Sequence, residues 1–127
     1  MSYSRNLFES LRDAFRGLKC LWESQRNARI HGAVTVAVLL LSGWLRLGIQ
    51  EFLFIGVAIA LVWVAETLNS ALEALTDMVS PEKSMKAKHA KDLAAASVLL
   101  AITAAVVIGF LVLGPPLYKR LILFGGP

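Results

Sequence analysis

A chain of 127 residues that is 57% hydrophobic, with a mean hydropathy of +0.64, is too apolar for an ordinary soluble domain and long enough for one small domain. The net charge of +4 does not indicate a nucleic-acid partner, because the basic residues flank apolar runs instead of alternating with exposed aromatic residues. The single cysteine, Cys20, excludes an intramolecular disulfide and a zinc site built on several cysteines of one chain. The composition therefore predicts an all-α integral membrane protein.

Residues 1–29 predict an amphipathic helix that lies on the membrane surface. Apolar residues recur mostly at spacings of three and four from Leu7 to Trp22. The basic residues between them are Arg5, Arg12, Arg16, Lys19 and Arg26. A helix with one apolar and one basic face suits the interface between headgroups and acyl chains. The alternative is a soluble helix packed on a small core. No early apolar stretch precedes Arg29, so the segment is not a signal peptide.

Three apolar runs follow at 30–47, 51–75 and 93–113, and each approaches the about 20 residues that cross a bilayer as a helix. A short turn, "WLRLGIQE", joins the first two runs. A polar cytoplasmic loop, 78–92, joins the second and third, and "GPP" ends the third run before a short tail, 114–127. The whole chain is thus predicted to form a single domain with a surface helix and three transmembrane helices.

The lysines and arginines predict the orientation of these spans. The N-terminal arm carries six of them and the loop 78–92 carries four, whereas the short turn carries only Arg46 and the tail carries two. Because positively charged segments stay in the cytoplasm, the N-terminus is predicted to be cytoplasmic and the C-terminus to lie outside.

A polar stripe interrupts the second apolar run in the stretch "WVAETLNSALEALTD". On a helix, its polar side chains fall within a sector of about 100° and rise roughly 16 Å from mid-span to the cytoplasmic end. They are Glu66, Asn69, Ser70, Glu73 and Asp77. An ionisable residue at the centre of a bilayer costs at least ~2.5–3.5 kcal/mol, so the stripe indicates function. It could join helices in an oligomer, line an ion pathway, bind a metal, or supply a general base.

The segment "KHAKD" favours phosphoryl transfer among these alternatives. It places Lys91 and Asp92 at the mouth of the third run, facing Asp77 across the loop. Phosphoryl transfer combines carboxylates that hold a divalent cation, a cation that neutralises phosphate, and a proton acceptor. The alternative for Lys83 and Lys86 is a positive-inside anchor. No GxxxxGK[ST] or kinase-type GxGxxG motif is present.

The two histidines are isolated in the sequence. Neither His31 nor His89 has metal-ligand spacing, and His31 borders the first apolar run. We therefore predict that His31 is an interface residue.

The stripe and the segment after it resemble the prokaryotic diacylglycerol kinase family, which includes undecaprenol kinases. The family pattern E-x-x-N-[ST]-x-x-E-x-x-x-D is present in "AETLNSALEALTD", and A-K-D follows in "AKDLAAASVLLA". The resemblance extends over nearly the whole chain, and "RNARIH" is closer to the undecaprenol-kinase-like members.

The resemblance implies an ATP- and Mg²⁺-dependent kinase that phosphorylates a lipid alcohol, undecaprenol-like or diacylglycerol, in the bacterial inner membrane. It also implies a homotrimer with composite active sites. Glu66 would be the general base and Glu73 the metal ligand. Lys91 and Asp92 would contact ATP. Asn69 and Asp77 would support the site, and the loop with Glu82, Lys83 and Ser84 would border the nucleotide.

Gln25 departs from the family pattern. Diacylglycerol-type members carry a metal-binding Glu at this position, and the amide oxygen of Gln25 would be a weaker ligand for metal and ATP. Glu23 lies two residues earlier on another face, and Asp13 lies near the place of a nucleotide-contacting aromatic residue of some members. The departure bears on metal affinity more than on the type of reaction.

Two other classes of function remain open at this point. A small proton- or cation-coupled transporter that used the same stripe would carry ions without ATP and would not need Lys91. A structural membrane oligomer would lose its assembly on Asn69→Ala or Glu73→Ala and would show no catalysis.

Overall fold

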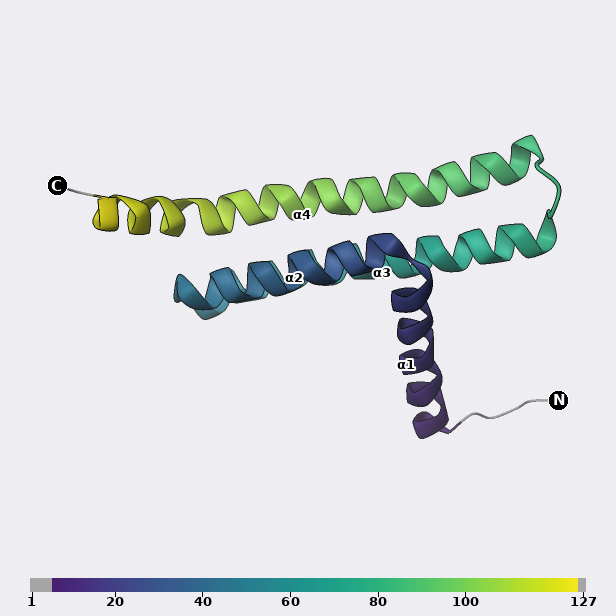
Figure 1. Ribbon diagram of the computed structural model, residues 1–127, viewed down its shortest axis with the longest axis horizontal. Coiled ribbons are helices and arrows are strands. Elements are labelled where there is room, and N and C mark those ends of the chain that lie inside the picture. The colour runs from purple at the N-terminus through teal and green to yellow at the C-terminus, as the bar shows by residue number, and fades with distance from the viewer. Residues whose placement is uncertain (1–5, 126–127) are drawn as a thin grey trace.

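The computed structural model describes residues 6–125, and the regular structure in this range is entirely helical. The helices are α1 (Leu7–Ser24), α2 (Arg26–Trp44), α3 (Ile49–Val79) and α4 (Met85–Gly125). Helices α2, α3 and α4 run side by side, whereas α1 turns away from their common direction (Figure 1). The predicted all-α fold is confirmed. Arg5 of the basic arm and the last two residues of the tail lie outside the described residues.

Helix α1 begins with a reciprocal cap. The Asn6 side chain accepts a hydrogen bond from the Glu9 N–H at 2.8 Å, and the Glu9 carboxylate accepts from the Asn6 N–H at 3.4 Å. The helix is amphipathic, and most of its large apolar side chains are exposed. They are Leu7, Phe8, Leu11, Phe15, Leu18 and Trp22. Such a face needs a membrane or a partner to cover it.

A corner at Gln25 separates α1 from α2. Gln25 has extended backbone angles, so the chain turns there and not at the predicted boundary of residue 29. The Arg29 guanidinium donates to the carbonyls of Trp22 and Glu23, each at 3.2 Å, and so satisfies acceptors left free where α1 ends. The Trp22 ring lies against Gly32, where an added Cβ would overlap ring atom Cζ3.

Gly32→Ala is expected to displace the Trp22 ring and to destabilise the corner. Forcing a methyl group into packed space costs typically about 1–3 kcal/mol, which would lower the melting temperature of the purified protein. Gly43→Ala on the same helix is the matched control, because nothing lies within 4 Å of its added Cβ. In a Trp22→Ala background the cost of Gly32→Ala should disappear. An equal cost with and without the Trp22 ring would contradict the contact.

The turn between α2 and α3 reverses the chain. The N–H of Leu47 donates to the Ser42 carbonyl at 3.3 Å, and the N–H of Arg46 donates to the Gly43 carbonyl at 3.1 Å. This pair of bonds is the Schellman arrangement, whose residue after the cap is left-handed. Arg46 is that residue, with φ of 53°. The tight turn makes α2 and α3 antiparallel neighbours.

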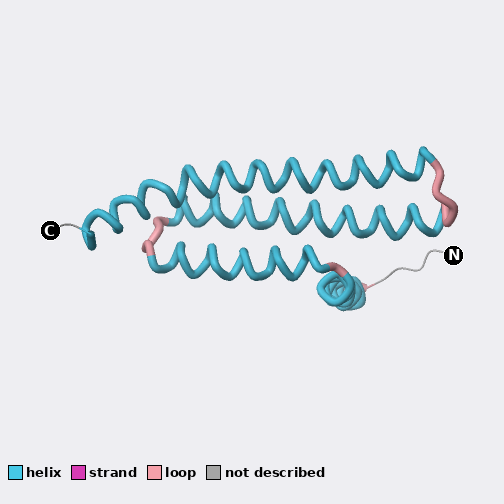
Figure 2. Tube along the Cα trace, turned by 45° about the horizontal axis from the view of Figure 1, so that its top comes forward, coloured by secondary structure: helices cyan, strands magenta, loops and turns pink. Residues whose placement is uncertain are grey.

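Helices α3 and α4 form the most extensive helix pair. Small and aliphatic side chains are buried along them, which lets the two backbones approach closely. These side chains are Ile55, Ala58, Ala94 and Ala101. The connection between α3 and α4 is shorter than the predicted loop 78–92, because the lysines from Lys86 onward belong to the first turns of α4 (Figure 2). Ser84 caps α4 by accepting from the Ala87 N–H at 3.1 Å.

Helix α4 continues through the predicted end at "GPP". It contains Pro115 and Pro116 and runs to Gly125, and Figure 2 shows its C-terminal turns departing from the line of the rest. Proline lacks a backbone N–H donor and bends a helix. A bend at Pro115 and Pro116 therefore lets α4 continue to Gly125 while its last turns leave the line of the rest. The Arg120 guanidinium holds these turns against α2. It donates to the Trp44 carbonyl at 2.9 Å and lies 4.5 Å from the centroid of the Trp44 ring.

By length and composition, α3 and α4 could each cross a membrane. Only 22% and 6% of their most apolar windows are buried, so most of this apolar surface faces outward. The helix of the first predicted span, α2, has 19 residues and does not meet the same test, because its first turns carry Arg26, Arg29 and His31.

Candidate active site

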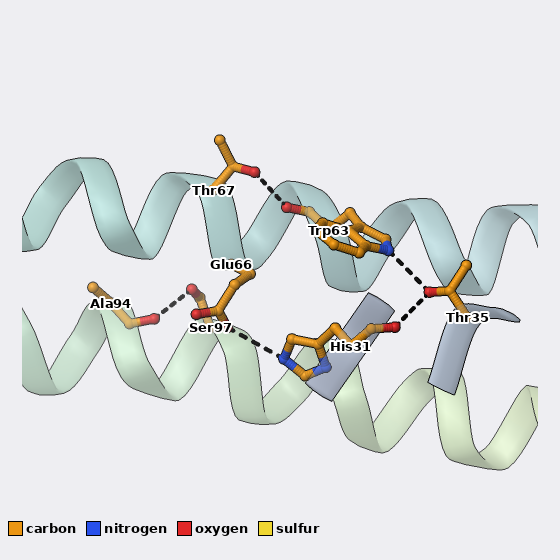
Figure 3. A network of polar contacts seen from close by, with 7 residues as sticks. All are labelled: His31, Thr35, Trp63, Glu66, Thr67, Ala94 and Ser97. Atoms are coloured by element: carbon orange, nitrogen blue, oxygen red, sulfur yellow. Dashed lines mark hydrogen bonds and ion pairs between the residues drawn. The ribbon is translucent and has the colours of Figure 1, made fainter. Parts of the chain in front are cut away.

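Glu66 is the most buried ionisable side chain of the described core. It lies on α3 with only 1% of its surface exposed. Its Oε2 atom lies 3.4 Å from Nε2 of His31 on α2, within the distance of an ion pair (Figure 3). The geometry is not that of a hydrogen bond, and Oε2 has no donor within the described part of the chain. A buried carboxylate oxygen without a donor is rare and is typical of a site that receives a ligand or a reacting group.

The His31 end of α2 is fixed to α3 by a short chain of hydrogen bonds. Trp63 Nε1 donates to the Thr35 hydroxyl at 3.0 Å, and this hydroxyl donates to the His31 carbonyl at 2.7 Å (Figure 3). The Thr67 hydroxyl donates in turn to the Trp63 carbonyl at 2.7 Å. The prediction that His31 is isolated is therefore wrong, since its side chain is only 16% exposed and faces Glu66.

Two further residues of the polar stripe also have a buried side-chain oxygen without a hydrogen-bond partner in the described part of the chain. Asn69 Oδ1 and Ser70 Oγ are buried and have no hydrogen-bond partner among the described residues. Because unpaired buried oxygens are costly, these atoms point to a partner, water or ligand from outside the single chain. Along the stripe, exposure rises from Glu66 through half-buried Glu73 to exposed Asp77.

The Asp77 end of the stripe meets α4. Lys91 Nζ forms an ion pair with Asp77 Oδ1, so the predicted approach of these two residues across the loop is observed. Lys91 precedes the apolar run of α4, and its hydrogen bond with Asp77 raises the pKa of Lys91 above its ordinary value. Burial opposes this rise, and the charges of Asp77 and Glu73 add to it. The side chain of Lys91 therefore remains positively charged, and it lies near the carboxylates of Asp77 and Glu73.

An apolar groove of about 620 Å³ lies between α2, α3 and α4, and His31, the partner of Glu66, is part of its lining. Its walls are aliphatic and aromatic side chains with glycines, and its hydrogen-bonding side chains are His31 and Thr35. On α2 it extends from Ile30 to Leu41, and on α4 from Ile102 to Leu117. One end of an apolar groove therefore opens beside the pair of His31 and Glu66.

Comparison with known proteins identifies the family. The model of the prokaryotic diacylglycerol kinase family matches residues 12–113, which is most of the chain. The chain belongs to the prokaryotic diacylglycerol kinase family. It is a lipid kinase, and its long apolar helices agree with the membrane location of this family.

Individual relatives of this lipid kinase carry two different names. A diacylglycerol kinase of Synechocystis is 39% identical over 118 residues, which cover 92% of this chain and 67% of the relative. The diacylglycerol kinase of Escherichia coli K12 is 30% identical over 94 residues, covering 74% and 77% of the two chains. The undecaprenol kinase of Bacillus subtilis is 33% identical over 110 residues, covering 87% and 89%.

The remaining residues expected in the kinase site lie on other parts of the chain. Gln25 is half-buried at the corner between α1 and α2, and Asp92 is exposed on the first turns of α4. The loop between α3 and α4 holds exposed Glu82 and Lys83. Ser84 lies there too, but its hydroxyl already caps α4. Within residues 6–125, no hydrogen bond or ion pair joins these residues to Glu66, which lies deeper along α3.

The metal ligands that these residues offer suit Mg²⁺ only if phosphate oxygens and water supply the rest of its coordination. No group of three His, Cys, Asp or Glu side chains that could hold a metal gathers anywhere in residues 6–125. Mg²⁺ in kinases is commonly held by one or two carboxylates together with phosphate oxygens and water. Half-buried Glu73, beside Lys91 and Asp77, fits that mode.

Proposed function

We propose that this kinase transfers the γ-phosphate of ATP to the hydroxyl of a membrane lipid alcohol, an undecaprenol-like polyprenol or diacylglycerol, at the cytoplasmic face of the bacterial inner membrane. The observation that carries the proposal is the Glu66 carboxylate, which is 1% exposed and has a buried oxygen without a donor. Its partner His31 lines an apolar groove, and Glu66 shares its helix face with the carboxylates near Lys91.

The proposed mechanism divides the site between lipid and nucleotide. The apolar part of the lipid lies in the groove, and its hydroxyl meets Glu66. Glu66 accepts the hydroxyl proton while the hydroxyl oxygen attacks the γ-phosphorus, and the bond from that phosphorus to ADP breaks. Glu73 lies two turns from Glu66, roughly 10 Å along the axis, which is within reach of a triphosphate.

The cytoplasmic residues hold the nucleotide in this proposal. Lys91 neutralises phosphate charge, with Asp92 and the loop from Glu82 to Ser84 at the border of the nucleotide. Glu73 and, more weakly, Gln25 would hold Mg²⁺, which would offset the charge of the phosphates. Asn69 and Asp77 support the site, Asp77 through its ion pair with Lys91.

The assembly we propose is a homotrimer of three-span protomers, with the N-terminus cytoplasmic, α1 on the membrane surface and α2 as the third span. The unpaired oxygens of Asn69 and Ser70 support active sites completed by a neighbouring protomer. The largely unburied apolar faces of α3 and α4 support helix contacts between protomers and with lipid.

A substrate panel tests the proposal. The purified protein, reconstituted in mixed micelles with Mg²⁺ and ATP radiolabelled on the γ-phosphate, is given undecaprenol, diacylglycerol and a shorter lipid alcohol in separate reactions. We expect a labelled lipid phosphate from undecaprenol or diacylglycerol, and the ratio of kcat/KM values identifies the preferred alcohol. If the assembled protein labels none of these lipids, the proposed reaction is wrong.

A further inference from the structure

His31 is the titratable side chain beside Glu66, and the proposed mechanism gives it no role. Placing a carboxylate in an apolar interior is costly unless another group pairs with it. Within the described residues, the ion-pair partner of Glu66 is His31. The nearby Ser97 hydroxyl does not take this role, because it donates to the Ala94 carbonyl at 2.6 Å (Figure 3).

Contacts made by neighbouring residues hold the backbone at His31 in place. The Thr35 hydroxyl holds the His31 carbonyl, and Trp63 holds Thr35 from α3, one turn before Glu66. On the other side, Gly32 lies under the Trp22 ring of α1. The backbone at His31 is therefore fixed relative to α3 and to α1, as it must be around a group that orients another group.

The contact between His31 and Glu66 is close but not aligned as a hydrogen bond. Nε2 lies 3.4 Å from Oε2, and Oε2 remains without a donor. Hydrogen bonds of catalytic groups are often long or misaligned without substrate and shorten in the reacting complex. A small rotation of the imidazole would direct its N–H at Oε2.

We propose that His31 is a positioning residue for the general base: its Nε2–H holds Oε2 of Glu66 and so directs the carboxylate toward the lipid hydroxyl at the end of the groove. This inference rests on the proposed role of Glu66. His31 also lines the groove, so one side chain joins the apolar channel to the base. An interaction that forms fully only during reaction contributes to kcat and leaves substrate binding nearly unchanged.

Replacements of His31 that keep or remove the donor test the proposal. His31→Leu removes the donor, His31→Asn places an amide too short to reach Oε2, and His31→Gln places an amide N–H near the position of Nε2. We expect His31→Leu and His31→Asn to lower kcat by about 10- to 100-fold, the effect of losing one hydrogen bond to a charged group. The KM values for ATP and lipid should change less than about threefold, and His31→Gln should recover most of kcat.

His89, the other histidine of the chain, is exposed on α4 and supplies the matched control, since His89→Leu should leave kcat unchanged. The polar His31→Asn variant keeps the test decisive if His31→Leu does not fold. The inference is overturned if His31→Asn retains kcat within about twofold, if His31→Gln is as poor as His31→Asn, or if the loss is confined to KM. Activity retained by Glu66→Gln would instead remove the proposed base itself, whatever His31 does.

Discussion

Glu66→Gln should lower kcat for lipid phosphorylation by about 10²- to 10⁴-fold, the usual contribution of a general base. The amide has nearly the same volume as the carboxylate and can still contact His31, but it cannot accept the hydroxyl proton. Because Glu66 is 1% exposed, water has little access to replace it as the base. The measurement is kcat in mixed micelles at saturating ATP and lipid alcohol.

The control for this prediction is Glu51→Gln, at the opposite end of the same helix. Glu51 accepts a hydrogen bond from the Gly48 N–H at 2.5 Å, and glutamine can also serve at this capping position. We expect Glu51→Gln to retain kcat. Full activity of correctly assembled Glu66→Gln protein would exclude Glu66 as the base.

Lys91→Met is expected to reduce kcat/KM for ATP by about 10- to 100-fold, because a charged contact with phosphate is lost. The thermal stability should change little, since partly exposed ion pairs such as the one with Asp77 contribute about 0.2–1 kcal/mol. Steady-state kinetics at varied ATP, together with a melting curve, would separate the two effects.

Two companion variants distinguish a nucleotide contact from a structural ion pair. Asp77→Asn breaks the same ion pair but leaves the cation in place, so it should cost less activity than Lys91→Met. Lys86→Met removes an exposed lysine from the same helix and should retain kcat/KM. If Asp77→Asn and Lys91→Met lose the same activity and the same stability, the role of Lys91 is structural.

The polar stripe was predictable from sequence because it depends only on the period of one helix. Glu66, Glu73 and Asp77 share a face in any helical arrangement of that stretch. The contact with His31 depends instead on the tight turn at Arg46. Antiparallel pairing brings His31 beside Glu66 and Thr35 beside Trp63. In both pairs the residue of α3 lies more than one helical turn farther along the chain from Arg46 than its partner on α2, so counting outward from the turn alone does not reveal these contacts.

The boundaries of the helices were harder to predict, because tertiary contacts determine them. The apolar period continues through Gln25, and the corner there depends on the contacts of Arg29 with the end of α1 and of Trp22 with Gly32. The loop 78–92 was overestimated because its lysines are polar, although lysine, alanine and methionine favour helices. Pro115 and Pro116 suggested an end, but Arg120 anchors the turns beyond them.

The corner at Gln25 has a consequence for two substrates of opposite solubility. If α1 lies flat on the bilayer, the contacts from Trp22 through Gly32 to His31 set Glu66 at the height of the headgroups. About 20 Å of α3 then stands above this plane in water. A lipid hydroxyl could be phosphorylated without leaving the bilayer, and ATP could donate its phosphate without entering it. The corner would thus fix the depth of Glu66 in the membrane, so that the lipid alcohol stays in the bilayer and ATP stays in water.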